Sequence, residues 1–348
     1  MKCRKTKIYM LCVILLFSFL LSGCLSSSAA EKNADGTQGE SAPVEYRCIS
    51  NPESKKKIYV ILKNYHGAYW KTVIEGVEKA AQEVGAAIYL GGIDNETDIS
   101  GQIRLMNEAI EQGADGILLA PANSNSLVES CEKAKKKNVS VVLIDSSINS
   151  TEFDACYMTD NIDAGKMAAK EMIKLLQDAG NSPTQPLEVG VLLSADTSQA
   201  MVNRVSGFLE AWTQYAPSQW DIAKDIFLNG GDIEKAQADA ADLLEKNKNI
   251  KGFYGCNNTS TIGIAKTLVK EKRTDIVMVG FDMAKETQQF IQDADYQGVS
   301  LLQKQDQMGY LGIHSLVSLI KGERLEQKFF DTGVIMVNSY YLMEKGVS

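Results

Sequence analysis

Polar and aromatic side chains gather in short loops that follow apolar runs of the chain. Examples are residues 63–70, 145–147, 256–259 and 281–283. Carboxylate, amide and guanidinium groups offer hydrogen-bond donors and acceptors in pairs, and aromatic faces pack against C–H groups. Each hydroxyl of a polyhydroxylated ligand both donates and accepts, and its C–H faces can lie on rings. The loops therefore predict a site for a polyhydroxylated ligand.

The elements on either side of these loops must position them. Apolar strand-like runs alternate with helical patterns, of which residues 69–84 are the clearest. Continuous apolar strands between amphipathic helices indicate a parallel sheet covered on both faces, and such sheets bind ligands at the carboxyl ends of their strands. A turn-rich segment at 180–186 divides the pattern, so two doubly wound α/β lobes are predicted. Strands are expected at 58–62, 87–90, 116–120, 139–144, 156–158, 187–193, 222–227, 252–255, 276–280 and 299–303, and helices at 69–84, 100–112, 123–137, 161–177, 198–215 and 232–246.

Signatures of catalysis and of metal binding are missing from the sequence. There is no G-x-S-x-G, H-E-x-x-H or Walker motif, and no G-x-G-x-x-G follows a strand. Asp145 and Asp282 could face each other like the carboxylates of a glycosidase, but nothing marks one of them as an acid of raised pKa. Residues 94–98 begin like a calcium loop, yet Ile99 stands where Gly is needed and Leu105 where Glu is needed. We expect neither enzyme activity nor a cofactor or metal.

The N-terminus has the pattern of an export signal. A basic start precedes a mostly apolar run at 8–21, which is shorter than the ~20 residues of a spanning helix. Leu21-Ser22-Gly23-Cys24 resembles the bacterial lipoprotein box, in which the Cys is lipidated and becomes the new N-terminus. We predict a signal peptide at 1–23, a lipid anchor on Cys24 at the extracytoplasmic side of the cell membrane, and a flexible tether at 24–56. A plain secretory signal is the alternative.

Cysteine usage and charge narrow the class further. Cys48, Cys131, Cys156 and Cys256 remain after the signal and the anchor, without a C-x-x-C pair. Their even number permits disulfides in an exported protein, and scattered buried thiols are the default interpretation. The chain has 36 basic and 44 acidic residues, a net charge of −8. Four of the basic residues precede the apolar run, so the remaining body is too acidic for nucleic-acid binding.

Eight short motifs follow one another along the chain, at 70–85, 113–121, 142–145, 159–165, 204–208, 255–258, 279–282 and 303–309. Together they resemble the type I periplasmic binding proteins, the ribose- and galactose-binding group that feeds sugar ABC importers. The resemblance covers about residues 57–337. It implies two doubly wound parallel-sheet lobes joined by a three-segment hinge, with crossings near 159–160, 303–304 and 331–332. The implied lobes are 57–158 plus 304–331 and 159–303 plus 332–348.

The resemblance also implies the ligand contacts. Tyr69 and Trp70 correspond to stacking aromatics. Two departures are Ser146, where sugar binders of this group often carry Arg, and Gly231, where the second lobe supplies another aromatic. Asn64 or His66 replaces an Asn expected just before the first aromatics. The implied hydrogen-bonding residues are Asn64, Asp145, Arg204, Asn257, Asp282 and Gln303.

The resemblance implies a monomeric lipoprotein that captures a small sugar between its lobes and delivers it to an ABC permease in the membrane. Closure over the ligand would shift an open–closed equilibrium by the difference in affinity. A receptor that presents the sugar to a sensor kinase or chemoreceptor is the alternative. A regulator of the lactose-repressor type shares this body but needs a helix-turn-helix where this chain has an export signal.

Overall fold

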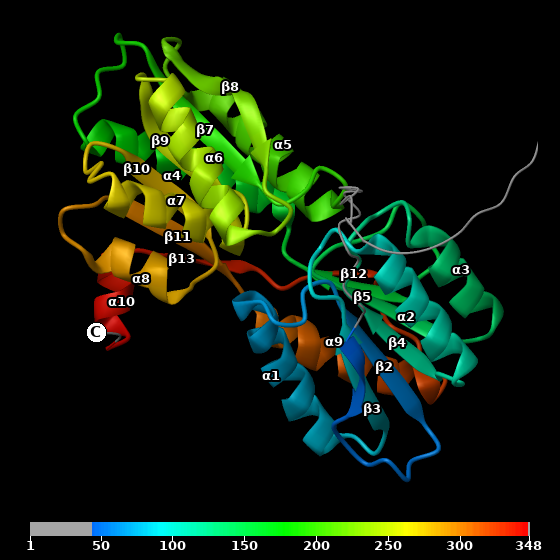
Figure 1. The fold of residues 1–348 in the computed structure, drawn as a ribbon. Coiled ribbons are helices and arrows are strands. Elements are labelled where there is room, and N and C mark those ends of the chain that lie inside the picture. The colour runs from blue at the N-terminus through cyan, green and yellow to red at the C-terminus, as the bar shows by residue number, and fades with distance from the viewer. Residues whose placement is uncertain (1–43, 347–348) are drawn as a thin grey trace, which may run out of the picture. The chain divides into compact units, whose positions relative to one another are not determined.

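Two sheets with helices on both faces make up the described part of the chain (Figure 1). The computed structural model describes residues 44–346, so the predicted signal peptide, Cys24 and the tether up to residue 43 lie outside the described residues. None of the helices within 44–346 has the length and apolar character needed to cross a membrane.

The first sheet has seven strands in the order β1-β3-β2-β4-β5-β6-β12. All neighbours are parallel except β1, which runs antiparallel to β3 at the edge. Val, Ile and Leu fill the central strands continuously because both faces are buried. The strands are β1 (Val44–Cys48), β2 (Lys57–Leu62), β3 (Ala87–Gly92), β4 (Gly116–Leu119), β5 (Ser140–Ile144), β6 (Ala155–Met158) and β12 (Phe329–Asp331).

Four helices cover the two faces of this sheet, and the sheet and these helices together form the first lobe. Helices α1 (Ala68–Glu83) and α9 (Gln305–Ile320) pack against each other and share one core with the sheet. Gly76 and Gly309 allow this contact, since a Cβ on Gly76 would lie 2.0 Å from the Asp306 carbonyl oxygen. Helices α2 (Ile99–Glu111) and α3 (Val128–Lys136) cover the opposite face.

The second sheet has six strands in the order β13-β11-β10-β9-β7-β8, and only β13 is antiparallel to its neighbour. The sheet and its helices form the second lobe. The strands are β7 (Leu187–Leu193), β8 (Trp220–Leu228), β9 (Ile250–Gly255), β10 (Val277–Phe281), β11 (Gly298–Gln303) and β13 (Val334–Val337). The helices are α4 (Asn161–Asp178), α5 (Gln199–Tyr215), α6 (Ile233–Lys246), α7 (Asn258–Lys270), α8 (Lys285–Gln292) and α10 (Ser339–Glu344).

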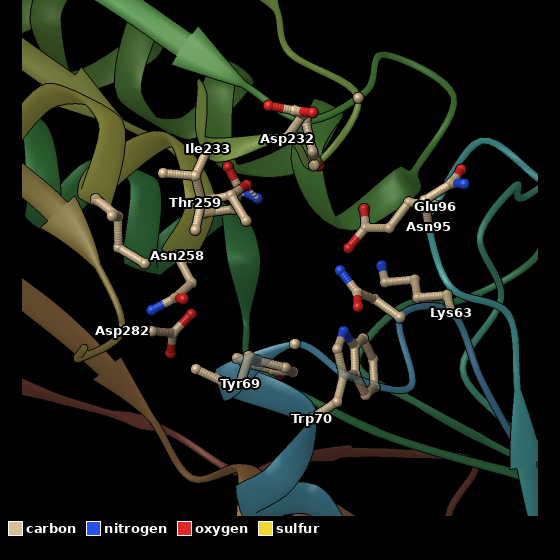
Figure 2. Close-up of a pocket in the computed structure, with 18 of the residues that line it drawn as sticks. Lys63, Tyr69, Trp70, Asn95, Glu96, Asp232, Ile233, Asn258, Thr259 and Asp282 are labelled. Atoms are coloured by element: carbon tan, nitrogen blue, oxygen red, sulfur yellow. Dashed lines mark hydrogen bonds between the residues drawn. The ribbon is translucent and has the colours of Figure 1, made fainter. Parts of the chain in front are cut away.

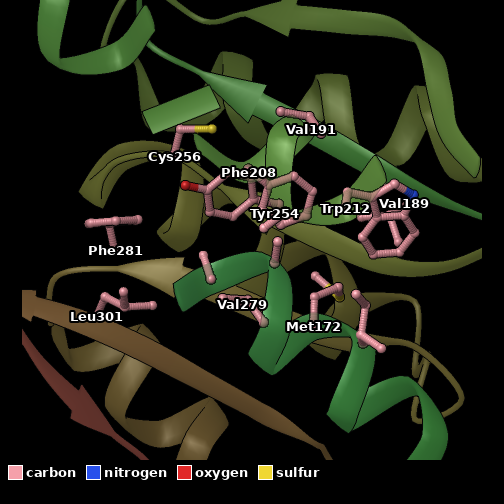
Figure 3. Close-up of a cluster of buried hydrophobic side chains, with 14 of the residues drawn as sticks. Met172, Val189, Val191, Phe208, Trp212, Tyr254, Cys256, Val279, Phe281 and Leu301 are labelled. Atoms are coloured by element: carbon pink, nitrogen blue, oxygen red, sulfur yellow. The ribbon is translucent and has the colours of Figure 1, made fainter. Parts of the chain in front are cut away.

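A stack of aromatic rings marks the core between helices α4 and α5 and this sheet (Figure 3). The Phe208 ring lies 4.2 Å from the Tyr254 ring and 5.7 Å from the Trp212 ring, in near-parallel planes. The opposite face of the sheet is covered by α6, α7 and α8, which share a second core. Helix α5 is thereby held firmly against the sheet whose loops contribute to the cavity described below.

The chain passes between the sheets three times, at 159–160, at Lys304 and at 332–333. The crossing segments are bonded to one another. The Thr159 hydroxyl donates to the Gln303 side-chain oxygen at 3.0 Å, and Asp331 accepts from the backbone N–H of Asp160 at 2.9 Å. Two doubly wound lobes joined by three segments, the fold class expected from the sequence, are confirmed, with one antiparallel edge strand added to each sheet.

The predicted tether is wrong over residues 44–48, which form strand β1. The Tyr46 hydroxyl donates to the Leu105 carbonyl at 2.9 Å, and its ring lies edge-on to Tyr59 at 4.8 Å. These contacts order a stretch that composition alone assigned to a linker. Cys48 is therefore part of the first sheet, and the four described cysteines are free thiols.

Helix α3 also begins later than predicted, at residue 128 instead of 123. The Asn123 side-chain oxygen accepts from the backbone N–H groups of Asn125 and Ser126, both at 2.9 Å. A side chain that satisfies backbone donors in this way favours a turn over a helix. Residues 123–127 therefore stay as a loop near the cavity.

Candidate functional site

A cavity of about 610 Å³ lies among the loops at the carboxyl ends of the strands of both lobes (Figure 2). Lys63 and Trp70 line one side of it, and Asp282 and Thr259 line the other. The structure brings together all eight residues that the resemblance implied: Asn64, Tyr69, Trp70, Asp145, Arg204, Asn257, Asp282 and Gln303. His66, the alternative to Asn64, is not among the lining residues; its exposed ring lies 3.4 Å from Asp94.

Asp145 is the central polar side chain that the first lobe contributes to the cavity wall. It follows strand β5 with a φ of +66°, and its N–H donates to the Tyr157 carbonyl at 3.0 Å. One carboxylate oxygen accepts from the Tyr69 hydroxyl at 2.7 Å, and the other lies 2.7 Å from the Lys63 ammonium. The carboxylate is therefore oriented by two side chains before any ligand binds.

The Lys63 ammonium is buried, with a side chain only 4% exposed. Burial alone lowers the pKa of a lysine, but the neighbouring Asp145 and Glu96 carboxylates outweigh it, so the pKa of Lys63 is raised. Burial and the same Asp145 carboxylate raise the pKa of the Tyr69 phenol well above its usual value. Lys63 is thus a permanent cation, and Tyr69 a permanent hydrogen-bond donor, at neutral pH.

Two aromatic rings stand at the start of helix α1, where Figure 2 shows them on the same side of the cavity. The centroids of Tyr69 and Trp70 are 4.9 Å apart at an interplanar angle of 72°. Trp70 is 3% exposed and also belongs to the first lobe's core, whereas Tyr69 is half-buried. Trp70 is therefore both a core residue and part of the cavity wall.

Asp282 is the corresponding carboxylate of the second lobe. It follows strand β10 with a φ of +64° and is 1% exposed. Its oxygens accept from the Gln303 backbone N–H at 3.2 Å, the Gln303 side-chain amide at 3.0 Å and the Gln305 side-chain amide at 2.9 Å. Burial raises the pKa of Asp282 to about 6, against the opposing effects of Arg204 and the Gln303 hydrogen bonds.

The Arg204 guanidinium, on helix α5, is buried beside this carboxylate network. It donates to the Asn161 side-chain oxygen at 2.8 Å, to the Cys256 carbonyl at 2.7 Å and to the Gln303 side-chain oxygen at 2.8 Å. Its planar group lies 3.9 Å from the centroid of the Phe281 ring. A guanidinium has five N–H donors. Three bonds hold Arg204 in one orientation and leave two donors for a ligand.

Asn257 combines a cavity position with a structural role. It is the N-cap of helix α7: its side-chain oxygen accepts from the Ser260 backbone N–H at 3.3 Å, and its amide donates to the Thr259 hydroxyl at 2.8 Å. One amide hydrogen is left over for a ligand.

Two further lining residues, Lys63 and Glu96, were not singled out as ligand contacts, although Lys63 lies in the predicted loop 63–70. Lys63 directly follows the buried strand β2. A cationic residue at the carboxyl end of a buried strand is a sequence feature from which its cavity position could have been predicted. Glu96 lies in the stretch that was rejected as a calcium loop. It accepts a hydrogen bond from the Ser194 side chain, and burial raises its pKa while Lys63 lowers it. Nothing in the local sequence of Glu96 indicated a cavity position.

Carboxylates outnumber cations in the cavity wall. The cationic residues of the lining are Lys63, Arg204 and Lys266, and the acidic residues are Asp94, Glu96, Asp145, Asp232, Glu234 and Asp282. Within residues 44–346 no cluster of His, Cys, Asp and Glu could hold a metal ion. The arrangement offers paired donors and acceptors beside two rings, which is suited to binding an uncharged polar molecule.

Two α/β lobes with a polar, aromatic-lined cavity between their strand-end loops define a ligand-capturing protein. Residues 58–324 match the family described as "Periplasmic binding protein domain". The chain belongs to this family, as the resemblance predicted.

Similar proteins carry the names of sugar-binding proteins. The chain is 24% identical to the D-allose-binding periplasmic protein of Escherichia coli K12 over 76% of this chain and 85% of that protein. It is 23% identical to the ribose import binding protein of Bacillus subtilis over 82% of this chain and 89% of that protein.

Among solved structures, an ABC transporter solute binding protein from Agrobacterium vitis with bound D-fucose is similar, with a TM-score of 0.77 and 27% identity. The match covers 84% of this chain and 98% of that one. A carbohydrate transporter solute binding protein from Agrobacterium radiobacter in complex with D-arabinose has a TM-score of 0.79 at 24% identity, over 85% of this chain and 98% of that one. At that identity the second likeness supports the fold.

Proposed function

We propose that this protein captures a small, uncharged sugar outside the cytoplasm and delivers it to an ABC importer. The observation that carries the proposal is the pair of preorganised carboxylates, Asp145 in one lobe and Asp282 in the other, each held by side chains in a cavity with aromatic rings. Carboxylates accept from sugar hydroxyls, Arg204 donates to them, and the rings cover C–H faces. The names of similar proteins, which concern allose, ribose and apiose, support the same class of ligand.

The finer parts of the proposal concern location and partners. Acyl chains on Cys24 would hold the monomeric protein at the outer face of the cytoplasmic membrane or in the periplasm, within reach of the permease. The protein itself has no catalytic role in this scheme, because the energy for transport is supplied by ATP hydrolysis on another subunit.

A thermal-shift screen followed by calorimetric titration tests the proposal. The panel contains D-allose, D-ribose, D-apiose, D-fucose and D-arabinose, with amino acids and nucleosides as unrelated solutes. We expect at least one sugar to raise the melting temperature and to titrate with one site, because a ligand that binds the native state stabilises it. Stabilisation by an unrelated solute and by none of the sugars would contradict the proposal.

Uptake measurements separate transport from sensing. Deletion of this chain from its host should abolish uptake of the radiolabelled sugar that binds in the screen. Normal uptake, combined with loss of a transcriptional or chemotactic response to that sugar, would instead identify a receptor for a sensor kinase or chemoreceptor.

A further inference from the structure

The N-terminus of helix α5 is capped by the other lobe. The N-cap residue Ser198 makes no side-chain hydrogen bond to its own helix. The first backbone N–H of the helix, at Gln199, donates to the Ser124 hydroxyl at 2.9 Å, and the second, at Ala200, donates to the Ser146 hydroxyl at 3.3 Å. Ser124 and Ser146 belong to the first lobe, where they follow strands β4 and β5.

The hydrogen bonds of Ser124 show that its hydroxyl oxygen is the acceptor for the N–H group of helix α5. The hydroxyl donates its own hydrogen to the Ser147 carbonyl at 2.7 Å, so a lone pair remains for the Gln199 N–H. The backbone N–H of Ser124 donates in the opposite direction, to the Thr197 carbonyl of the second lobe at 3.1 Å. Ser124 is therefore bonded to the second lobe through both its main chain and its side chain.

Water is excluded from this contact. Ser124, Ser146 and Ser198 are 2%, 0% and 1% exposed, and the hydroxyl oxygens of Ser146 and Ser198 are 3.3 Å apart. The first N–H groups of a helix have no acceptor within the helix, and they carry the positive end of its dipole. The Gln199 and Ala200 N–H groups have serine acceptors only while the two lobes are in contact.

The contact is connected to the cavity without being part of it. Helix α5 also carries Arg204, and Ser146 directly follows Asp145, so the capped helix and the capping loop each hold a cavity residue. Neither Ser124 nor Ser146 lines the cavity. Their hydroxyls can therefore affect ligand capture only through the positions of the elements they join.

We propose that Ser124 and Ser146 are positioning residues for ligand capture: they complete the cap of helix α5 only in the closed form and thereby favour that form with Arg204 in place. The apparent dissociation constant of a ligand that binds the closed form is inversely proportional to the fraction of closed protein. Loss of the two hydroxyls therefore weakens the binding of every ligand by one common factor. The predicted effect on ligand affinity rests on the proposed sugar-binding function. The predicted effect of the two serines on closure of the lobes does not depend on it.

Hydrogen exchange in the ligand-free protein tests closure directly. The variants are Ser124→Ala, Ser146→Ala and their combination. Ser147→Ala is the matched control, because Ser147 lies in the same loop and is equally buried, while its hydroxyl bonds within the first lobe, to the Ile148 carbonyl at 3.4 Å and to the Cys156 side chain. The readouts are the exchange rates of the Gln199 and Ala200 amides and the radius of gyration from X-ray scattering.

We expect the combined variant to exchange the Gln199 and Ala200 amides at least about tenfold faster than the wild type and to have a larger radius of gyration. The Ser147→Ala protein should match the wild type in both measurements. Amides in the middle of helix α5, such as that of Phe208, should keep their rates. Unchanged rates at 199 and 200, or an equal acceleration at 208 that indicates global unfolding, would overturn the proposal.

Titrations with D-ribose and D-allose test the link to capture. Each single variant should weaken the binding of either sugar by about 5-fold, with the ratio of the two affinities unchanged and the loss appearing mainly as faster dissociation. A change in the affinity ratio would indicate direct ligand contact and overturn the positioning role. If the wild type binds neither sugar, the choice of sugars under the proposed function fails, and the exchange experiment still decides the proposal.

Discussion

Asp145 and Asp282 share an unusual backbone geometry at equivalent places of the two lobes. Each is the first residue after a strand and has a left-handed φ, +66° and +64°. Each also donates its N–H to the next strand, to the Tyr157 and Leu301 carbonyls at 3.0 and 2.9 Å. This conformation costs a non-glycine residue about 1 kcal/mol or more and persists only where the surroundings enforce it. Its recurrence at both carboxylates links the strain to their placement in the cavity wall.

Removal of the Arg204 side chain should weaken sugar binding by at least about tenfold, equivalent to ~1.4 kcal/mol. The reason is that Arg204 carries two spare donors and holds Gln303 through a third, so Arg204→Ala leaves ligand hydroxyls and the buried network without partners. Calorimetry measures the effect, with circular dichroism to verify folding. Lys224→Ala, at an exposed position on β8, is the control. Wild-type affinity in a folded Arg204→Ala protein would refute the site assignment.

Titration of Asp282 should make the ligand-free protein less stable as the pH rises from about 4 to 7. The buried carboxyl has a pKa of about 6, against 3.8 as its reference value, so the folded state binds the proton more tightly than the unfolded state. Its contribution is fully present below pH 3.8 and is lost as the pH passes 6, an effect of about 2–3 kcal/mol.

Urea unfolding of the wild type and of Asp282→Asn at several pH values measures this effect. The amide does not titrate, so the stability of the variant relative to the wild type should improve between pH 4 and pH 7. A constant difference between the two proteins over that range would mean that Asp282 does not bind a proton in this window.

Glu96 should make the cavity reject acidic sugars. Its carboxyl group and that of Asp145 both interact electrostatically with the Lys63 ammonium, and acidic residues outnumber cations in the cavity wall. At ~6 Å and an effective dielectric constant of about 20, a like charge costs roughly 3 kcal/mol. We expect the uronic acid of whichever neutral sugar binds to bind the wild type at least about tenfold more weakly. Glu96→Gln should narrow that gap, whereas Glu129→Gln, exposed on α3, should not; equal gaps in all three proteins would contradict the role of Glu96.

Eight of the 25 residues that line the cavity could be predicted individually, because the strand-end loops carry recognisable motifs. All eight residues implied by the resemblance line the cavity, and their binding roles stay predictions until a ligand is titrated. Lys63 and Glu96 were missed for a physical reason. Their placement depends on contacts between distant segments, such as the Lys63–Asp145 ion pair across 82 positions of chain, which no local pattern reveals.

At the scale of elements, helix pairs set the distance between cavity residues. Helices α4 and α5 approach so closely that a Cβ on Gly165 would lie 2.1 Å from the Arg204 carbonyl oxygen, and one on Gly207 would lie 2.0 Å from that of Ile162. These two glycines place the backbone of Arg204 against helix α4, where the Asn161 side chain accepts from its guanidinium. The small residues thus position the cation of the second lobe.

Gly165→Ala should therefore weaken both the fold and the site. The added methyl group meets backbone and not a movable side chain, so the helices must separate, which typically costs about 1–3 kcal/mol. We expect a loss of that size in unfolding free energy and weaker sugar binding through displacement of Arg204. Gly85→Ala is the matched control, since a Cβ there has no atom within 4 Å. Equal stabilities of the two variants in urea unfolding would contradict the predicted contact.

The elements themselves were predictable where they are long and buried on both faces. All ten expected strands form, nine of them inside a sheet and β8 at an edge, because continuous apolar runs between turn signals identify strands. Strands β1, β12 and β13 were not predicted. They have only three to five residues and lie at sheet edges, where part of the pattern is exposed and pairing depends on a neighbour that is distant in sequence.

At the scale of the whole described chain, the hydrogen bonds of the cavity and those of the crossing segments form one network. Gln303 ends strand β11 just before the crossing at Lys304; its side-chain oxygen accepts from Arg204 and from Thr159, which lies in another crossing. Its amide donates to Asp282. A ligand that contacts Arg204 or Asp282 therefore acts on residues bonded directly to the segments about which the lobes would move. Gln303 thus connects two cavity residues, Arg204 and Asp282, to the crossings at 159–160 and Lys304 through direct hydrogen bonds.

Delivery of a ligand to a permease also requires that the protein stays close to the membrane, which the cavity alone does not ensure. Cys24, outside the described residues, follows a basic start and an apolar run and has the small residue Gly23 before it. Because acylation of this thiol would anchor the chain, Cys24→Ala should release the protein from the membrane fraction or leave it unprocessed. Fractionation, labelling with a radioactive fatty acid and the mass of the mature chain measure the outcome.

The control is Cys48→Ala, which removes the thiol of strand β1 and should stay acylated and membrane-bound. Unchanged processing and membrane retention of the Cys24→Ala protein would show that the chain is held by something other than a lipid on this residue.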